Sequence, residues 1–295
     1  MASLKEVRNR IVSVGSTQQI TKAMKMVAAA KLRRAQDNIL QMRPYAQRLN
    51  DILTNLSSVS GESSASVYSQ KREVQRVLIM VITSDRGLCG AFNSNAIKAA
   101  NNLINDRYRA LAEAGRVEIM AIGKKGHDIF SKRNLPLVGN YTTLFTNLSF
   151  DTVRVAAEQA MEGFRTGYYD QVDIVYNEFK NVATQIIRTE QFLPIQEKPA
   201  EEASNVALDY IYEPSKEEIV EQLIPKSLKV QVYKAVLESK ASEEGARMTA
   251  MDKATENAGE LLKQLKLTYN RTRQAAITTE ILEIVGGAEA LAASR

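Results

Sequence analysis

Apolar and small residues recur about every 3.5 residues along the first part of the chain, in one frame that runs without a break from Leu4 to Leu56. The positions of this stripe are Leu4, Val7, Ile11, Val14, Gln18, Thr21, Lys25, Ala28, Leu32, Ala35, Ile39, Met42, Ala46, Leu49, Leu53 and Leu56. A repeat of this period is typical of a helix that faces a partner helix along its whole length. The pattern therefore predicts a long coiled-coil helix at the start of the chain.

The last part of the chain carries a second helical pattern. From Lys226 to Val285 there is no proline and there are only two glycines, Gly245 and Gly259, while apolar residues again stand at helical spacing. At ~1.5 Å per residue, helices of these lengths extend to roughly 80 Å or more, well beyond the radius of a globular domain. A lone amphipathic helix leaves its stripe in water. We therefore expect the two ends to pair antiparallel, with the middle of the chain as a head.

The middle of the chain alternates short apolar runs with helical patterns. Val77–Thr83 and Val117–Gly123 are continuous apolar runs, typical of strands buried on both faces of a parallel sheet. Val172–Phe179 and Thr184–Ile195 are close enough in sequence to form a hairpin, which adds an antiparallel edge. Helices are expected over Asn93–Ala114, near His127 and over Phe150–Gly167. This order predicts an α/β head of doubly wound, Rossmann-like character.

Composition shifts divide the chain into four parts. The serine-rich run Ser57–Ser66 separates the first helix from the head, and Gln196–Ser204 has the composition of a surface loop. Leu208–Pro214 reads as a short extended segment, and Ser215 with Glu218 matches a capping box for the last helix. The predicted parts are a coiled-coil helix over 1–60, an α/β head over 72–195, a loop and foot segment over 196–214, and a second coiled-coil helix over 215–295.

Rare residue types and charge exclude several classes of protein. The one cysteine, Cys89, rules out an internal disulfide, and with a single histidine, His127, no thiolate or histidine metal cluster is expected. The start of the chain lacks the apolar core of a signal peptide, and no stretch has the ~18 apolar residues of a membrane span. We therefore expect an intracellular protein whose membrane connection, if it has one, is made through a partner.

The net charge of +5 is unevenly distributed. Residues 1–60 hold 10 Lys and Arg against 3 Asp and Glu, whereas residues 61–225 hold 18 against 22. Such a helix suits nucleic acid, acidic lipid or an acidic protein surface, or it is simply solvated. Nucleic acid is disfavoured because the basic residues share their helix with the coiled-coil stripe.

No motif for chemistry is well formed. Ser84–Gly90 (SDRGLCG) follows the first strand, where α/β folds place ligand loops, but it matches neither glycine-rich phosphate motif, and Gly123–Gly126 (GKKG) also lacks the required residues. Cys89 and His127 are interpreted as structural, since no nucleophile and base can be assembled from them. We therefore expect no catalytic residue, no metal and no cofactor in this chain.

A polar interruption of the first stripe is one sign of contacts outside the chain. Gln18, Thr21 and Lys25 interrupt the first stripe, while apolar Ile20, Met24 and Val27 lie on a shifted face. This indicates either a drift of the stripe from a 3.5-residue to about a 3.6-residue period or a surface that another protein grips.

The end of the last helix is apolar on two adjoining sides. Its first stripe is formed by Ile277, Ile281, Ile284, Ala288 and Leu291, and Leu282 with Val285 forms the second. One partner helix cannot cover both stripes. Hydrogen-bonding residues lie just before and among the first of these positions, namely Arg271, Arg273, Gln274, Thr278 and Glu280. The pattern predicts that the tip lies in an apolar sleeve with a polar collar beside it.

The chain resembles a known family over essentially its whole length. The segments that carry the resemblance are Ile20–Gln36, Arg43–Ala46, Ser84–Gly90, Asp209–Pro214, Ala246–Ala258 and Tyr269–Ala288. Together, and in this order, they are similar to the gamma subunits of bacterial F-type ATP synthases. The resemblance implies a central rotor shaft: an antiparallel coiled coil inside a ring of three alpha and three beta subunits, with the head on the membrane ring of c subunits. Rotation of such a shaft couples transmembrane ion flow to ATP synthesis or hydrolysis.

The resemblance also assigns residues and a location. The family's contacts with the beta-subunit catch loop fall on Met24, Arg247, Arg273, Gln274, Thr278 and Glu280. The sleeve contacts fall on Ile277, Ile281, Leu282, Ile284 and Val285. Tyr210 and Tyr212 match the foot that touches the c-ring and the epsilon subunit. The implied protein is non-catalytic alone and peripheral at the cytoplasmic face of the bacterial inner membrane, which it reaches only through the c-ring.

The sequence departs from the family at a few points. Gly15 and Ser16 replace a long polar residue and asparagine, and the plastid regulatory insertion with its cysteine pair is absent. No transit peptide precedes the first residues, which favours a bacterial protein. Two other classes stay open on the residues alone. One is an α/β binding module whose coiled-coil arm acts as a spacer or a nucleic-acid grip, and the other is a metabolic enzyme with a dimerising arm.

Overall fold

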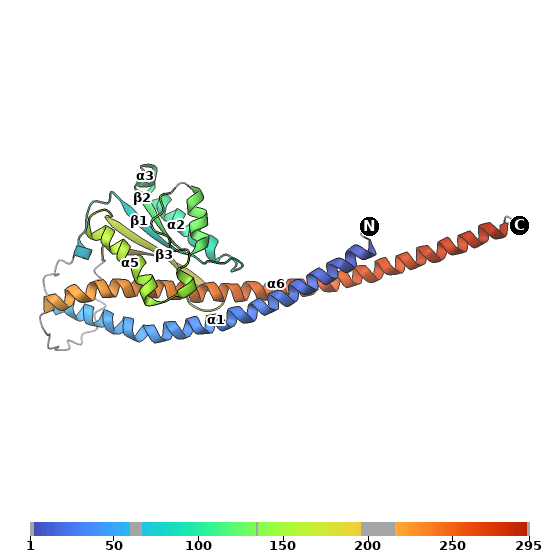
Figure 1. The fold of residues 1–295 in the computed structure, drawn as a ribbon, viewed down its shortest axis with the longest axis horizontal. Coiled ribbons are helices and arrows are strands. Elements are labelled where there is room, and N and C mark those ends of the chain that lie inside the picture. The colour runs from blue at the N-terminus through green and yellow to red at the C-terminus, as the bar shows by residue number, and fades with distance from the viewer. Residues whose placement is uncertain (1–2, 60–66, 134, 196–215, 294–295) are drawn as a thin grey trace. The chain divides into compact units, whose positions relative to one another are not determined.

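The computed structural model describes residues 3–59, 67–133, 135–195 and 216–293 (Figure 1). They form two compact units, the first of residues 1–27 with 248–295, and the second of residues 28–247. The principal elements in chain order are α1 (Leu4–Val59), β1 (Val77–Ile82), α2 (Phe92–Arg107), α3 (Arg109–Glu113), β2 (Val117–Ile122), α4 (Lys124–Phe130), α5 (Phe150–Arg165), β3 (Gln171–Phe179), β4 (Gln185–Leu193) and α6 (Lys216–Ala293). Short 3₁₀ turns lie at Val67–Ser69, Ser131–Arg133 and Leu144–Asn147.

The second unit is built on a four-stranded sheet in the order β2-β1-β3-β4. β1 pairs in parallel with β2 and with β3, with Leu78 opposite both Glu118 and Val172. β4 runs antiparallel to β3 and forms the edge. The predicted strands and the antiparallel edge are therefore confirmed.

Helices cover both faces of this sheet, because the side chains of its central strand alternate between two cores. Leu78, Met80 and Ile82 of β1 point to a core that also contains buried residues of α5 and α6, such as Phe164 and Val232. Val77, Ile79 and Val81 point to the opposite core, which α2 and α4 complete. Strands that are buried on both faces read as continuous apolar runs, which is why the sequence identified them.

The stripe predicted for α1 is confirmed by burial. Each of its residues whose side chain is described, from Leu4 to Leu49, is buried or half-buried. Apolar residues outside the frame are exposed, such as Val12 (64%) and Leu40 (60%). The period of about 3.5 residues therefore identified the packed side of the helix correctly.

In the first unit α1 and α6 pair antiparallel. Lys25 contacts Asp252, whereas Gln18, earlier in α1, contacts Thr255, later in α6. An added Cβ on Gly259 would lie 2.9 Å from the Gln18 side chain, so the helices approach closely there. The predicted antiparallel pairing is confirmed within this unit.

Some local expectations differ from the structure. The single helix predicted over Asn93–Ala114 is divided at Tyr108, whose φ of −121° is not helical. The phenol of Tyr108 donates a 2.6 Å hydrogen bond to buried Asp173 of β3, and this long-range contact fixes the residue where the helix breaks. The predicted capping box at Ser215, the surface loop and the extended segment before it lie outside the described residues.

Candidate functional site

The end of α6 in the first unit has no cover within the described chain. Every side chain from Arg273 to Ala288 is exposed, whereas half-buried residues recur along α6 as far as Thr272. The exposed apolar residues are Ile277, Ile281, Leu282, Ile284 and Val285. For Leu282 and Ile284 the exposed fractions reach 66% and 68%. Contiguous exposed apolar surface of this kind marks an interaction site.

Polar side chains form a collar beside this apolar surface. Arg273, Gln274, Thr278 and Glu280 are all exposed on α6. The hydroxyl of Thr278 donates to the carbonyl of Gln274 at 2.9 Å, while Arg273 and Glu280 take part in no ion pair with the described residues. The charged ends of Arg273 and Glu280 are therefore available to another molecule.

Met24 lies on α1 in the same unit and is half-buried. Ile20, Met26 and Val27 around it are exposed, with fractions of 59%, 62% and 55%. Of the predicted outward face, Ile20 and Val27 are therefore exposed, whereas Met24 is only partly exposed.

The polar interruption of the stripe has a partner inside the chain. Oγ1 of Thr21 lies 2.8 Å from Oγ1 of Thr255, and Lys25 Nζ lies 2.5 Å from Asp252 Oδ1. The stripe does not drift away from α6 here, because Thr21 is buried and Lys25 is half-buried. Gln18, Thr21 and Lys25 thus form a polar layer between the two helices.

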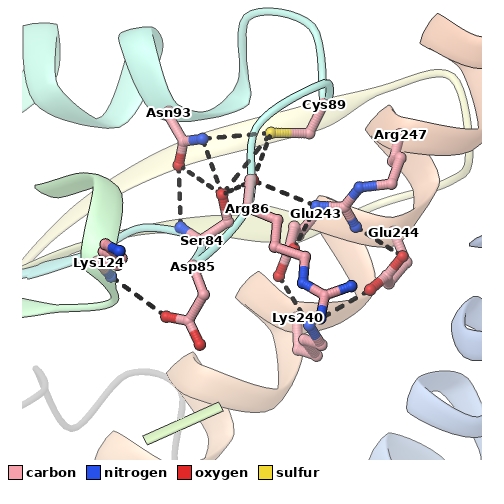
Figure 2. Close-up of polar contacts among 10 residues, drawn as sticks. All are labelled: Ser84, Asp85, Arg86, Cys89, Asn93, Lys124, Lys240, Glu243, Glu244 and Arg247. Atoms are coloured by element: carbon pink, nitrogen blue, oxygen red, sulfur yellow. Dashed lines mark hydrogen bonds and ion pairs between the residues drawn. The ribbon is translucent and has the colours of Figure 1, made fainter. Parts of the chain in front are cut away.

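Arg247 lies in the second unit and is only 8% exposed. Its Nη1 donates to Glu244 Oε2 at 2.7 Å, and its Nη2 donates to Glu243 Oε1 at 2.5 Å and to the Arg86 carbonyl at 3.3 Å. Lys240 also pairs with both glutamates, at 2.9 and 3.3 Å. Figure 2 shows this ion cluster of α6 beside the loop that follows β1.

Sequence reasoning did not find this ion cluster. Lys240, Glu243, Glu244 and Arg247 stand three and four residues apart, a spacing that places them on one helix face and was a usable signal. Burial lowers the pKa of the Arg247 guanidinium, but the adjacent charges of Glu243 and Glu244 outweigh burial and raise that pKa. Arg247 is therefore a cation with its charge already compensated.

The loop Ser84–Gly90 directs its polar groups to the protein itself. Ser84 N–H donates to Asn93 Oδ1 at 2.9 Å, and Asp85 accepts from the Lys124 N–H at 3.2 Å. A Cβ on Gly123 would lie 2.3 Å from the Thr83 carbonyl oxygen, so the backbones at the ends of β1 and β2 are in close contact there. The geometry gives no support to phosphate binding by this loop.

Cys89 is buried, with 1% exposed, and lies 3.2 Å from Asn93 Nδ2. Burial raises the pKa of its thiol, which disfavours the reactive thiolate form. His127 is half-buried on α4. Among the described residues there is no group of three His, Cys, Asp or Glu side chains arranged to hold a metal ion.

The foot residues Tyr210 and Tyr212 lie outside the described residues. Within the described part of the chain, no helix has the length and apolarity required to span a membrane.

Comparison with known proteins identifies relatives over the whole chain. A family model described as ATP synthase matches residues 3–291. The chain is 64% identical over 293 residues to the ATP synthase gamma chain of Cytophaga hutchinsonii, with 99% of each covered. It is 57% identical over 292 residues to that of Flavobacterium johnsoniae, again with 99% of each covered.

Solved structures share the fold. A chain of the Tetrahymena thermophila mitochondrial ATP synthase central stalk and c-ring is 28% identical with a TM-score of 0.57, covering 80% of this chain and 99% of that one. A chain of the Euglena gracilis mitochondrial ATP synthase is 23% identical with a TM-score of 0.66, covering 99% and 95%. With its long terminal helices and four-stranded α/β sheet, the chain has the fold of an ATP synthase central stalk. The chain belongs to the family of ATP synthase gamma chains.

Proposed function

We propose that this chain is the rotating shaft of an F-type ATP synthase, turning inside a ring of three alpha and three beta subunits. The observation that carries the proposal is the exposed end of α6, where Ile281, Leu282 and Ile284 have no cover in the described chain. An apolar helix end of this kind requires an enclosing partner. In support, the Euglena relative was solved in an assembly of OSCP, F1 and c-ring in a rotational state.

The proposed mechanism is coupling by differential contact. The shaft is asymmetric, so each orientation presents different side chains to each beta subunit and shifts its nucleotide affinity, which couples rotation to catalysis. The apolar tip centres the shaft in its sleeve. Met24 and the collar residues Arg273, Gln274, Thr278 and Glu280 make the grip on the beta catch loop. Arg247, which the resemblance places in the same set, differs from them because its charge is bound within the chain.

The other partners and the location complete the proposal. The chain has the four parts that its sequence predicts. The foot residues Tyr210 and Tyr212 contact the c-ring and the epsilon subunit, and the head rests on the c-ring. Contact with the membrane is made only through the c-ring, at the cytoplasmic face of the bacterial inner membrane. The chain is non-catalytic alone and carries no cofactor. Nucleic acid is not a partner.

The grip is tested by replacing Arg273 and Gln274 together with alanine. Both are exposed, so we expect the isolated chain to keep its helix content while ATP synthesis by membranes carrying the variant falls several-fold. The matched control is Lys263→Ala with Gln264→Ala, a similar exposed pair on the same helix. Unchanged synthesis in the Arg273 and Gln274 variant contradicts the proposed grip, and failure of the wild-type chain to co-purify with alpha and beta subunits contradicts the function as a whole.

A further inference from the structure

The turn after β1 is held in a conformation that its sequence does not favour. Leu88 has a φ of 62°, in the left-handed region that bulky residues avoid, and its side chain is 63% exposed. Such a residue persists only where the surrounding structure fixes it. The loop between Ser84 and Gly90 must therefore be restrained by contacts outside Leu88 itself.

The Arg86 carbonyl is the point where the restraints converge. It accepts a hydrogen bond from Ser84 Oγ at 2.6 Å and another from Arg247 Nη2 at 3.3 Å. The Cys89 thiol is also directed at this carbonyl, at 3.9 Å. Ser84 and Cys89 belong to the loop, so Arg247 is the donor that joins this carbonyl to α6 (Figure 2).

Arg247 is fixed for this task by its neighbours on α6. One carboxylate binds each terminal nitrogen, and Lys240 balances the second negative charge. The planar fork of arginine permits this arrangement, since its two terminal nitrogens donate in different fixed directions, whereas a lysine ammonium is a single point charge. With two acids and two bases in contact, the cluster has no net charge to attract an acidic partner.

We infer that Arg247 is an internal latch that positions the β1–α2 loop against α6, and that it does not contact a partner subunit directly. The latch connects the carboxyl end of β1 to α6 within the second unit. In the proposed rotor, on which this step rests, the latch makes the sheet and this part of α6 turn as one body. Loss of the latch then reduces the ions pumped per ATP hydrolysed.

The only cysteine of the chain reports on the latch, because Cys89 is buried in the same loop. In the purified full-length chain we expect N-ethylmaleimide to label Cys89 slowly, because the thiol is buried, and mass spectrometry of the peptide gives the rate. Arg247→Lys keeps the charge but loses the fork. We expect it to increase the labelling rate by about tenfold or more, the effect of losing a hydrogen bond from a charged group. The matched control Arg273→Lys, at an exposed arginine of the same helix, leaves the rate unchanged.

A second variant removes one positive and one negative charge of the ion cluster together. Arg247→Gln with Glu243→Gln leaves Lys240 to pair with Glu244, and we expect the same rise in labelling with unchanged helix content. Labelling within twofold of wild type in both folded variants overturns the latch. If, in that case, ion pumping per ATP still falls in membranes, Arg247 binds a partner directly. Failure of the wild-type chain to support pumping at all contradicts the proposed function and leaves the labelling result valid.

Discussion

Thr255 of α6 and Thr21 of α1 are joined through their hydroxyl groups, with Oγ1 atoms 2.8 Å apart at the interface of the two helices. Thr21 also donates to the Gln18 carbonyl at 3.0 Å, and the Thr255 hydroxyl lies 2.7 Å from the Met251 carbonyl. The pair is buried on the α1 side, where Thr21 is 9% exposed. A polar contact at a single level of an apolar interface restricts the register in which two helices can pair.

The first prediction concerns this pair. Thr21→Val and Thr255→Val each remove one hydroxyl and keep the shape of the side chain. We expect the double variant to be close to wild type in stability, with a coupling free energy between the two sites of about 0.5–1 kcal/mol. Urea unfolding of the four proteins, followed by circular dichroism, measures this coupling. Additive effects show that the two hydroxyls do not interact.

The second prediction concerns a buried acid on α6. Glu238 is 4% exposed, and its Oε2 has no hydrogen-bond partner in the described chain. Burial raises the pKa of this carboxyl, although the charges of Lys234 and Arg43 oppose the shift. The folded state therefore binds the proton more tightly than the unfolded state, and stability falls as the pH rises from the usual Glu range through the folded pKa.

Glu238→Gln removes this charge. We expect the variant to be more stable to urea than wild type at pH 7 to 8, by on the order of 1 kcal/mol, since an unpaired acceptor costs more when it is buried with a charge than when it is neutral. The difference shrinks as the pH falls and is lost below about 4, where the wild-type carboxyl becomes protonated in both states.

Glu158→Gln is the control with opposite sign. A hydrogen bond from Lys229 lowers the pKa of Glu158, so its contribution is present above the usual Glu pKa and is lost as the pH falls through the folded pKa. This variant is less stable than wild type at neutral pH, by a small amount because the site is half exposed. A Glu238→Gln effect that is independent of pH contradicts the role of its charge.

The third prediction concerns the junction of β2 and α4. Gly123 has a φ of 99°, and an added Cβ would lie 2.3 Å from the Thr83 carbonyl oxygen. Gly123→Ala therefore combines backbone strain with a clash against backbone, and we expect a loss of about 3 kcal/mol or more. Gly115 also has a positive φ, 68°, but has no neighbour within 4 Å of the added atom. Gly115→Ala should therefore cost only about 1 kcal/mol. Thermal unfolding of the two variants and the wild type measures both losses. Equal losses at the two sites show that the Thr83 contact is not the cause.

Sequence reasoning located the elements whose pattern is local. The stripe of α1 and the strand Val77–Ile82 were found because periodicity and continuous apolar runs report directly on packing. The break at Tyr108 was missed because it depends on Asp173, which lies 65 residues away in sequence. The four-part division of the chain stays a prediction.

Part of the candidate site could likewise be predicted from the sequence, and part could not. The two apolar sides of the α6 end were visible in the sequence, because nothing else in the helix explains Leu282 beside Ile281. The sequence did not indicate that Arg247 is buried and bound within the chain, since its burial and its hydrogen bond to the Arg86 carbonyl depend on how the sheet packs against α6. A family resemblance assigns a role to a position, but it does not show whether the side chain is free to perform it.

The last prediction separates folding from assembly at the end of α6. Ile281→Ser with Ile284→Ser changes two side chains that are 55% and 68% exposed, so the stability of the isolated chain should change by less than about 0.5 kcal/mol. The same variant should fail to co-purify with alpha and beta subunits, because the apolar sleeve then encloses hydroxyl groups without partners.

Ile11→Ser provides the opposite case. Ile11 is a half-buried stripe residue of α1 in the same unit, and serine there removes apolar area that the two helices bury against each other. We expect this variant to unfold earlier as an isolated chain and to assemble when it is folded. The tip variant should thus lower the co-purification yield and leave the urea midpoint unchanged, whereas Ile11→Ser should lower the urea midpoint and leave assembly of the folded chain unchanged. If the tip variant instead lowers the urea midpoint of the isolated chain while assembly is unchanged, the exposed end of α6 packs within its own chain, and the enclosing sleeve is wrong.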